Sequence, residues 1–183
     1  MGYRIRVEQD QDCESPNEYS IGKVVSFSTR HSDFQHPDTI DEGDILTLLS
    51  YSEHGRHQWR VAGDARPLGI DQWDDVGVAG VIVWNGEDDG RKWWDDRPDD
   101  EKAEALRSIA EEYTAWGNGD CFGYILERST ECASCGNVEW EDVDSCWGFI
   151  VADLDVKKAM REWWGVDLPT DTTWDDVEIV YPW

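Results

Sequence analysis

Apolar and polar residues alternate along much of the chain, which predicts a protein built largely from short β-strands. Residues Tyr3–Glu8 place Tyr3, Ile5 and Val7 on one side and charged residues on the other, as in a strand with one buried face. Similar stretches rich in Val, Ile and aromatic residues lie between glycines and polar loops. The further strands expected are Gly22–Ser28, Ile45–Tyr51, Gln58–Ala62, Val76–Trp84, Cys121–Arg128, Val138–Val143, Cys146–Val151 and Trp174–Tyr181.

Apolar residues at helical spacing predict two helices. Pro98 suits the first turn of a helix, and the acidic residues after it interact favourably with the positive end of the helix dipole. The apolar side of this helix carries Leu106, Ile109, Ala110, Tyr113 and Trp116, and its acidic residues gather on the opposite side. A second helix is expected to begin at Asp153 and to bury Ala159, Met160, Trp163 and Trp164.

The order of these elements indicates a fold class. The strands and two helices do not alternate as repeated βαβ units, which argues against a parallel sheet. We therefore expect an α+β fold with a mainly antiparallel sheet and two helices packed on it. The length and the apolar content are those of one domain spanning residues 1–183.

The charge of the chain restricts its function. The sequence has 41 acidic and 16 basic residues, a net charge of -25. This balance excludes binding to nucleic acid by neutralising phosphates, which needs excess Lys and Arg. No apolar run approaches the roughly 20 residues that cross a membrane, and an odd count of five cysteines suits a reducing compartment. We expect a protein of the cytoplasm that binds neither membrane nor nucleic acid directly.

Such a charge has three ordinary causes: solubility, life in high salt, or a basic partner. The densest acidic block is Asn85–Glu104, for which a solvated loop is the ordinary interpretation. Its acids could instead join those of the following helix in one partner-binding face, with two tryptophans as anchors. The candidate partner-binding residues are Trp93, Trp94, Asp95, Asp96, Asp99, Asp100, Glu101, Glu104, Glu111 and Glu112.

A pair of cysteines, Cys132 and Cys135, has the spacing of half a zinc site. Cys121 and Cys146 could supply two more thiolates. If Cys121–Arg128 pairs with Val138–Val143 in a hairpin, however, those two lie at its base, roughly 23 Å from the tip. The residues therefore leave two interpretations open: Cys132 and Cys135 bind a metal, or they form a tight turn with free thiols.

No complete catalytic or cofactor motif is present. The sequence lacks a phosphate-binding loop, a dinucleotide fingerprint and a nucleophile elbow. His31, His36, His54 and His57 lack the spacing of a metal site and are expected to be loop histidines that solvent or backbone satisfies. We expect a protein that is not an enzyme and needs no cofactor.

Several ordered segments resemble small, acidic, Trp-rich proteins encoded by phages of actinobacteria. The segments are Leu49-Ser50-Tyr51, Glu53-His54-Gly55, Ala79-Gly80-Val81 with Trp84, Tyr113-Thr114 with Trp116 and Asn118-Gly119, Gly123-Tyr124, and Asp144-Ser145-Cys146-Trp147-Gly148-Phe149. The resemblance implies a phage origin and makes salt adaptation a less natural cause of the charge. It supplies no catalytic residues.

These observations lead to two hypotheses. The first is a phage-encoded DNA mimic that inhibits a basic nucleic-acid-binding protein of the host cell, such as a CRISPR effector, a restriction enzyme or a transcription component. Its carboxylates would take the places of phosphates. The second is a small protein-interaction module, stabilised by zinc or not, whose charge serves solubility. The sequence leaves the oligomeric state open.

Overall fold

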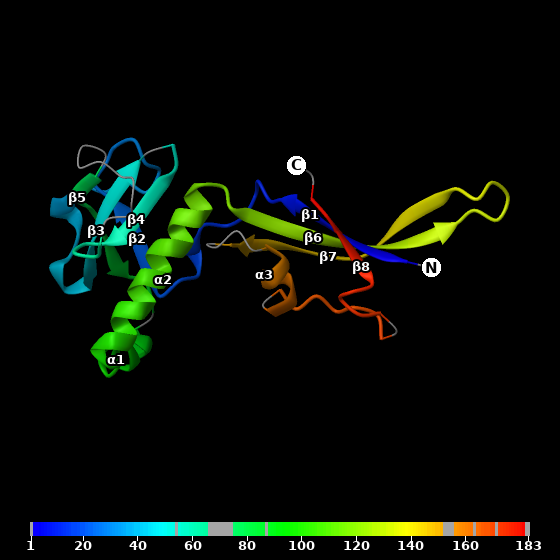
Figure 1. Ribbon diagram of the computed structural model, residues 1–183. Helices are drawn as coiled ribbons and strands as arrows, with labels where there is room; N and C mark the ends of the chain where they lie inside the picture. The colour runs from blue at the N-terminus through cyan, green and yellow to red at the C-terminus, as the bar shows by residue number, and fades with distance from the viewer. Residues whose placement is uncertain are drawn as a thin grey trace. The chain divides into compact units, whose positions relative to one another are not determined.

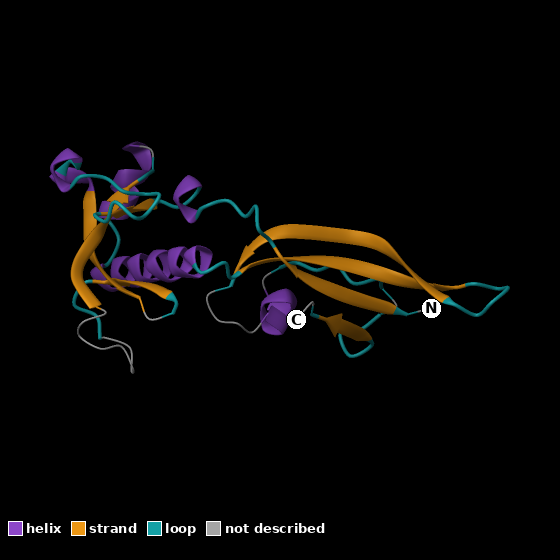
Figure 2. Cartoon of the chain, turned by 90° about the horizontal axis from the view of Figure 1, so that it is seen from above, coloured by secondary structure: helices purple, strands orange, loops and turns teal. Residues whose placement is uncertain are grey.

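A computed structural model describes residues 2–53, 55–65, 75–86, 88–151, 156–162, 164–170 and 172–181. β-Strands dominate this part of the chain (Figures 1 and 2). The described strands are β1 Tyr3–Gln9, β2 Gly22–Ser26, β3 Ile45–Glu53, β4 His57–Val61, β5 Asp75–Trp84, β6 Cys121–Glu131, β7 Val138–Ile150 and β8 Val177–Val180. The described α-helices are α1 Asp88–Asp95, α2 Asp99–Gly117 and α3 Val156–Glu162, and short 3-10 helices span Pro16–Glu18, Pro37–Thr39 and Glu42–Asp44.

The chain forms two compact units, each with its own sheet. Unit 1 comprises Met1–Cys13 and Gly119–Trp183, and unit 2 comprises Glu14–Asn118. Unit 2 is therefore inserted into the sequence of unit 1, between β1 and β6. The single domain expected over residues 1–183 stays a prediction.

Unit 1 contains a sheet with the strand order β7-β6-β1-β8. β1 pairs antiparallel with β6 and parallel with β8, so the sheet is mixed. One face of β1 is fully buried at Ile5 and Val7, and these residues share a core with Ala159 and Met160 of α3. The alternation along Tyr3–Glu8 thus predicts this buried face correctly.

Unit 2 contains an antiparallel sheet with the order β2-β5-β3-β4. The apolar side of α2 packs on it, and Leu106, Ile109 and Tyr113 share a core with Val24 and Ile82 of the sheet. The predicted hairpin of β3 and β4, the interior position of β5 and the helix after Pro98 are confirmed.

The expected fold class is wrong. In place of a mainly antiparallel sheet with two helices, the described residues form a mostly β protein with eight strands in two sheets and three α-helices. Periodicity locates strands but does not specify their partners: β1 pairs with β6 and β8, more than a hundred residues away in sequence. Helix α1 occupies part of the block interpreted as a solvated loop. This helix was not predicted from the sequence, because its few apolar residues show no clear helical spacing.

Further differences concern the C-terminal half. Val138–Val143 and Cys146–Val151 belong mainly to one long strand, β7, which pairs with β6 around a tip at residues 132–137. Asp153 and Trp163 lie outside the described residues. No helix in the described ranges is both long and apolar enough to span a membrane.

Two glycines of β5 provide a test of the packing in unit 2. A Cβ at Gly80 would overlap the carbonyl oxygen of Val25 and lie 3.1 Å from the ring of Trp59, whereas a Cβ at Gly77 would meet nothing within 4 Å. We expect Gly80→Ala to lower the free energy of unfolding by about 2 kcal/mol. Gly77→Ala should change it by no more than ~0.5 kcal/mol in either direction. Urea unfolding followed by Trp fluorescence compares the variants, and equal midpoints would contradict the packing described.

Candidate functional site

Helices α1 and α2 of unit 2 display the predicted acidic residues. The apolar side of α2 is buried on the sheet, so its acidic side faces solvent. We define the acidic face as the set Asp95, Asp96, Asp99, Asp100, Glu101, Glu104, Glu111 and Glu112. All of them are exposed except Glu112, which is half-buried and accepts a hydrogen bond from the hydroxyl of Tyr19 at 3.0 Å.

The basic side chains near the acidic face bind either one acid of the face or a group outside it. Arg91 pairs with Asp95 at 3.3 Å, and Lys102 donates to the backbone oxygen of Asp95 at 2.8 Å. Arg107 makes two hydrogen bonds to Asp64, which hold the pKa of that carboxyl below its usual range. Within the described chain, six members of the face therefore form no ion pair. They are Asp96, Asp99, Asp100, Glu101, Glu104 and Glu111.

The two predicted aromatic anchors differ in exposure. Trp94 is only 4% exposed and packs in the core of unit 2 beside Trp84, with ring centroids 6.3 Å apart. Trp93 is 53% exposed, and the guanidinium of Arg97 lies 3.9 Å from its ring centre. Only Trp93 of this pair is placed to contact a partner.

Negative charge is not confined to this face. Unit 1 has 18 acidic and 6 basic residues, and unit 2 has 23 acidic and 10 basic residues. Exposed acids also line β7, where Glu139 and Asp142 are two of them. The acidic face is thus one locally dense surface on a chain that is negative in both units.

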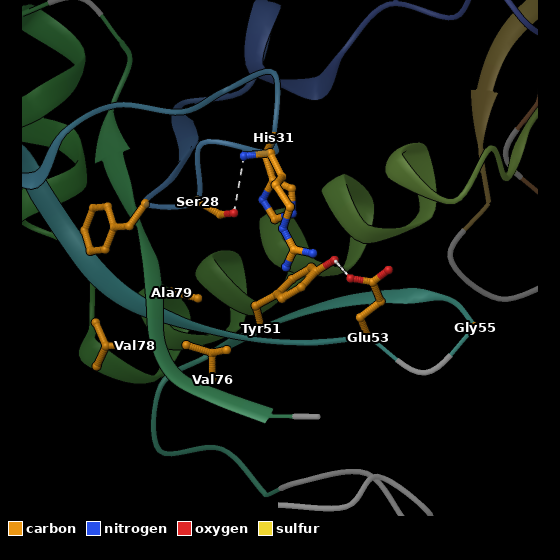
Figure 3. Close-up of a pocket in the computed structure, with 10 residues that line it drawn as sticks. Ser28, His31, Tyr51, Glu53, Gly55, Val76, Val78 and Ala79 are labelled. Carbon is orange, nitrogen blue, oxygen red and sulfur yellow. Dashed lines mark hydrogen bonds between the residues drawn. The ribbon is translucent and has the colours of Figure 1, made fainter. Parts of the chain in front are cut away.

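Unit 2 also contains a pocket that the sequence did not reveal. Its volume is about 620 Å³, within the range of small-molecule sites. Val76 and Val78 of β5 line it together with Tyr51 and Glu53 of β3 and the loop that carries His31 (Figure 3). We call it the β5 pocket. The two valines are 51% and 53% exposed, and they lie where the pairing of β5 with β3 is irregular, between Gly80 and Val76.

Hydrogen bonds fix the polar groups of the β5 pocket. The Tyr51 hydroxyl donates to a carboxylate oxygen of Glu53 at 3.2 Å and also contacts Nδ1 of His57. Burial, helped by the Glu53 charge, raises the pKa of Tyr51 to about 12. Burial and the neighbouring His57 and Arg30 lower the pKa of His31. At neutral pH, Tyr51 is therefore a hydrogen-bond donor and His31 is largely uncharged.

The pair of His31 and Ser26 does not form a catalytic nucleophile and base. Nδ1 of His31 lies 2.7 Å from the hydroxyl of Ser26, a distance suitable for activating a nucleophile. Ser26 is fully buried, however, so a substrate cannot reach it. The bond orients the His31 ring, which packs against Tyr51 and Trp59 with centroids 5.0 and 5.5 Å away.

Sequence reasoning treated the histidines as loop residues satisfied by solvent or backbone. His31 bonds to Ser26, and His57 lies in β4 and contacts Tyr51. Part of this arrangement was predictable from the hairpin of β3 and β4, because its register places Tyr51 opposite Trp59 and Glu53 opposite His57. No periodicity places the His31 loop over them. His36 is exposed and accepts a hydrogen bond from a backbone N–H, and His54 lies outside the described residues.

The cysteines do not form a four-thiolate site. Cys132 and Cys135 lie at the tip of the β6–β7 hairpin, which we call the cysteine tip (residues 132–137). Cys121 is opposite Ile150, and Cys146 is opposite Tyr124, both well down the strands. No group of three or more metal-binding side chains comes together in the described residues.

Hydrogen bonding distinguishes the two thiols of this tip. The Cys132 sulfur lies 3.1 Å from the hydroxyl of Ser134. Hydrogen bonds from the side chain and backbone of Ser134, and from Cys135, lower the pKa of the Cys132 thiol to about 6. Cys132 is thus mostly thiolate at neutral pH.

No family model, curated protein or solved structure matches the chain. The class of protein is therefore defined by its own fold and surface: an acidic, mostly β protein of two units with a helical acidic face. The likeness to phage proteins of actinobacteria stays a prediction.

Alkylation tests the hydrogen bonds at the cysteine tip. We expect the rate at which iodoacetamide modifies Cys132 to be nearly constant above pH 7 and to fall by half near pH 6, because the thiolate is the nucleophile. Ser134→Ala removes one of the bonds, so it should raise this midpoint and slow modification at pH 7. Tandem mass spectrometry locates the modified cysteine. A midpoint near the ordinary cysteine value of about 8.5 in both proteins would contradict the geometry.

Proposed function

We propose that the protein is a phage-encoded inhibitor that binds a basic nucleic-acid-binding protein of the host cell, with its acidic face in the place of phosphates. One observation carries the proposal: six carboxylates without an ion pair lie exposed along α2 and the turn before it. A row of uncompensated charges in solvent opposes folding, so its concentration on one face calls for a complementary surface.

The spacing of the charges supports mimicry of one nucleic-acid strand. A helix rises 1.5 Å per residue, so α2 extends about 20 Å from Asp99 to Glu112. One strand of duplex DNA carries a phosphate every 3.4 Å, or about six phosphates over that length. Five of the six carboxylates without an ion pair lie in this stretch, close to the number of phosphates that a Lys- and Arg-lined groove would meet.

The other parts of the molecule have distinct roles in this proposal. Trp93, exposed beside the acidic face, supplies an apolar contact of the kind that dominates many interfaces. The acids of unit 1 add to the long-range field and speed association with a basic partner. They do not need to touch it.

Neutralisation of the face tests the proposal. The variant Asp96→Asn/Asp99→Asn/Asp100→Asn/Glu104→Gln removes four charges from exposed side chains. The control Glu131→Gln/Glu139→Gln/Asp142→Asn/Glu178→Gln removes four from exposed side chains of unit 1. The wild type, the face variant and the control are each immobilised and used to capture proteins from a host lysate, with and without competitor duplex DNA. Charge pairs across an interface are worth enough for the face variant to bind about tenfold more weakly or worse.

The outcomes separate the hypotheses. We expect the wild type and the control to retain the same nucleic-acid-handling protein, competitor DNA to release it, and the face variant to lose it. Equal capture by both variants, or capture only of proteins with no nucleic-acid function, would contradict the proposal.

The β5 pocket favours a second candidate function, the binding of a small polar ligand without net charge. Arg30 supplies donors, Glu53 supplies an acceptor, and Val76 and Val78 supply an apolar surface. Because Arg30 and Glu53 balance in charge, the pocket suits a polar ligand without net charge.

Adenosine is a suitable probe for this pocket. We expect it to raise the melting temperature of the wild type by a few degrees, but not that of Val78→Glu, which places a charge in the pocket. Leu48→Glu is the matched control, since Leu48 is 45% exposed and is paired with Val81, whose side chain points to the other face of the sheet. Adenosine should stabilise this control as it does the wild type. No shift in the wild type, or an equal shift in Val78→Glu, would remove this candidate.

A further inference from the structure

The cysteine tip closes as a compact turn. The backbone N–H of Gly136 donates to the oxygen of Cys132 at 2.8 Å, and the N–H of Cys132 donates to the oxygen of Asn137 at 2.8 Å. Gly136 has φ +71°, a left-handed conformation that suits glycine. These bonds hold Cys132 and Cys135 on one short loop without a contribution from the rest of unit 1.

The two thiols share this turn, with two residues between them. The Cys132 sulfur lies 3.1 Å from the hydroxyl of Ser134. A hydroxyl beside a cysteine sulfur orients it and can donate a hydrogen bond to a metal-bound thiolate. Both cysteines are free, and Cys135 is exposed.

One chain supplies only half of a tetrahedral site. Structural zinc takes four ligands at about 2.3 Å from each sulfur. Cys121 and Cys146 are ten and eight residues from the tip ends of their strands, which places them roughly 25 to 35 Å away at 3.3 Å per residue. Cys13 is hydrogen-bonded to Cys121, so it is equally remote. The described residues contain no cluster that would add a third ligand.

The tip is open to a second molecule. β1 pairs with β6 as far as Arg128, and Gly2 still bonds to Ser129. From Thr130 to the tip, the described pairing is between β6 and β7 (Figure 1). Residues 133–139 are all exposed. A two-stranded end with two thiols at its apex can approach an identical end without interference from the rest of its own sheet.

We propose that the cysteine tip is half of a zinc site, and that a second copy of this chain completes it with its own Cys132 and Cys135. A twofold axis through the metal gives four sulfur ligands, the number that a closed zinc site requires. Each thiol that is still protonated releases its proton to solvent as its bond to zinc forms, and no oxidant or reductant takes part.

Charge makes this association depend on the metal. Glu131 and Glu139 flank the tip in each copy, and each chain carries a net charge of -25. Like charges therefore oppose contact between two tips until zinc binds the thiolates. This inference does not rest on the proposed function, since the cysteine tip is in unit 1 and the acidic face is in unit 2.

Metal titration of the full chain tests the inference. Reduced, metal-free protein is titrated with Zn²⁺ or Co²⁺, and the mass is followed by native mass spectrometry and light scattering. We expect one metal per two chains, a dimer that forms in step with metal binding and dissociates with chelator, and the Co²⁺ spectrum of a tetrahedral four-sulfur site. Cys132→Ser and Cys135→Ser should each weaken metal binding at least a hundredfold and abolish the dimer.

Cys146→Ser is the matched control, because Cys146 is an exposed cysteine of the same hairpin. It should bind metal and dimerise as the wild type does. One metal per monomer, a dimer that forms without metal, binding that survives in Cys132→Ser, or an absence of binding would each overturn the proposal.

Discussion

The packing of α2 on the sheet of unit 2 is the interaction on which the rest of that unit depends. It buries Leu106, Ile109 and Tyr113, and so turns the acidic side of the helix to solvent. The same helix covers the edge of the sheet: the Asn118 amide bonds both the N–H and the oxygen of His57 at 2.8 Å. The Thr114 hydroxyl of α2 likewise accepts a hydrogen bond from the N–H of Trp59 at 2.9 Å. Side chains of α2 and of its C-cap Asn118 thus take the place of a neighbouring strand beside β4.

This arrangement also explains where the β5 pocket lies. The core residues that α2 packs on include Ile82, but Val76 and Val78, nearer the start of β5, stay exposed. The loop through His31 and the side chains of Tyr51 and Glu53 surround these valines. One helix position therefore sets both candidate surfaces of unit 2, the acidic face on its solvent side and the pocket beside the core it covers.

Local sequence signals predict the elements far better than their assembly. Alternation finds β1 and the hairpin of β3 and β4, and Pro98 with the apolar period that follows finds α2. β1 pairs with β6 and β8, from which the whole of unit 2 separates it in the sequence. No local pattern of residues predicts a pairing over such a separation. The acidic residues of α2 were predictable as one helix face, and the cysteine tip as a hairpin turn. The β5 pocket was not, because a loop without periodicity closes it. The burial of Trp94 and the exposure of Trp93 were not predictable either. Both depend on α1, whose polar sequence resembles a loop.

The central claim is that carboxylates of α2 make ionic contacts in the nucleic-acid groove of a basic protein. The most direct measurement is the dissociation constant for the captured partner as a function of salt concentration. If about six carboxylates engage Lys and Arg, affinity should fall steeply and log-linearly with salt, as it does for the same partner on single-stranded or duplex nucleic acid. An affinity that hardly changes between low and high salt would show that apolar contacts hold the complex, and the claim would be wrong.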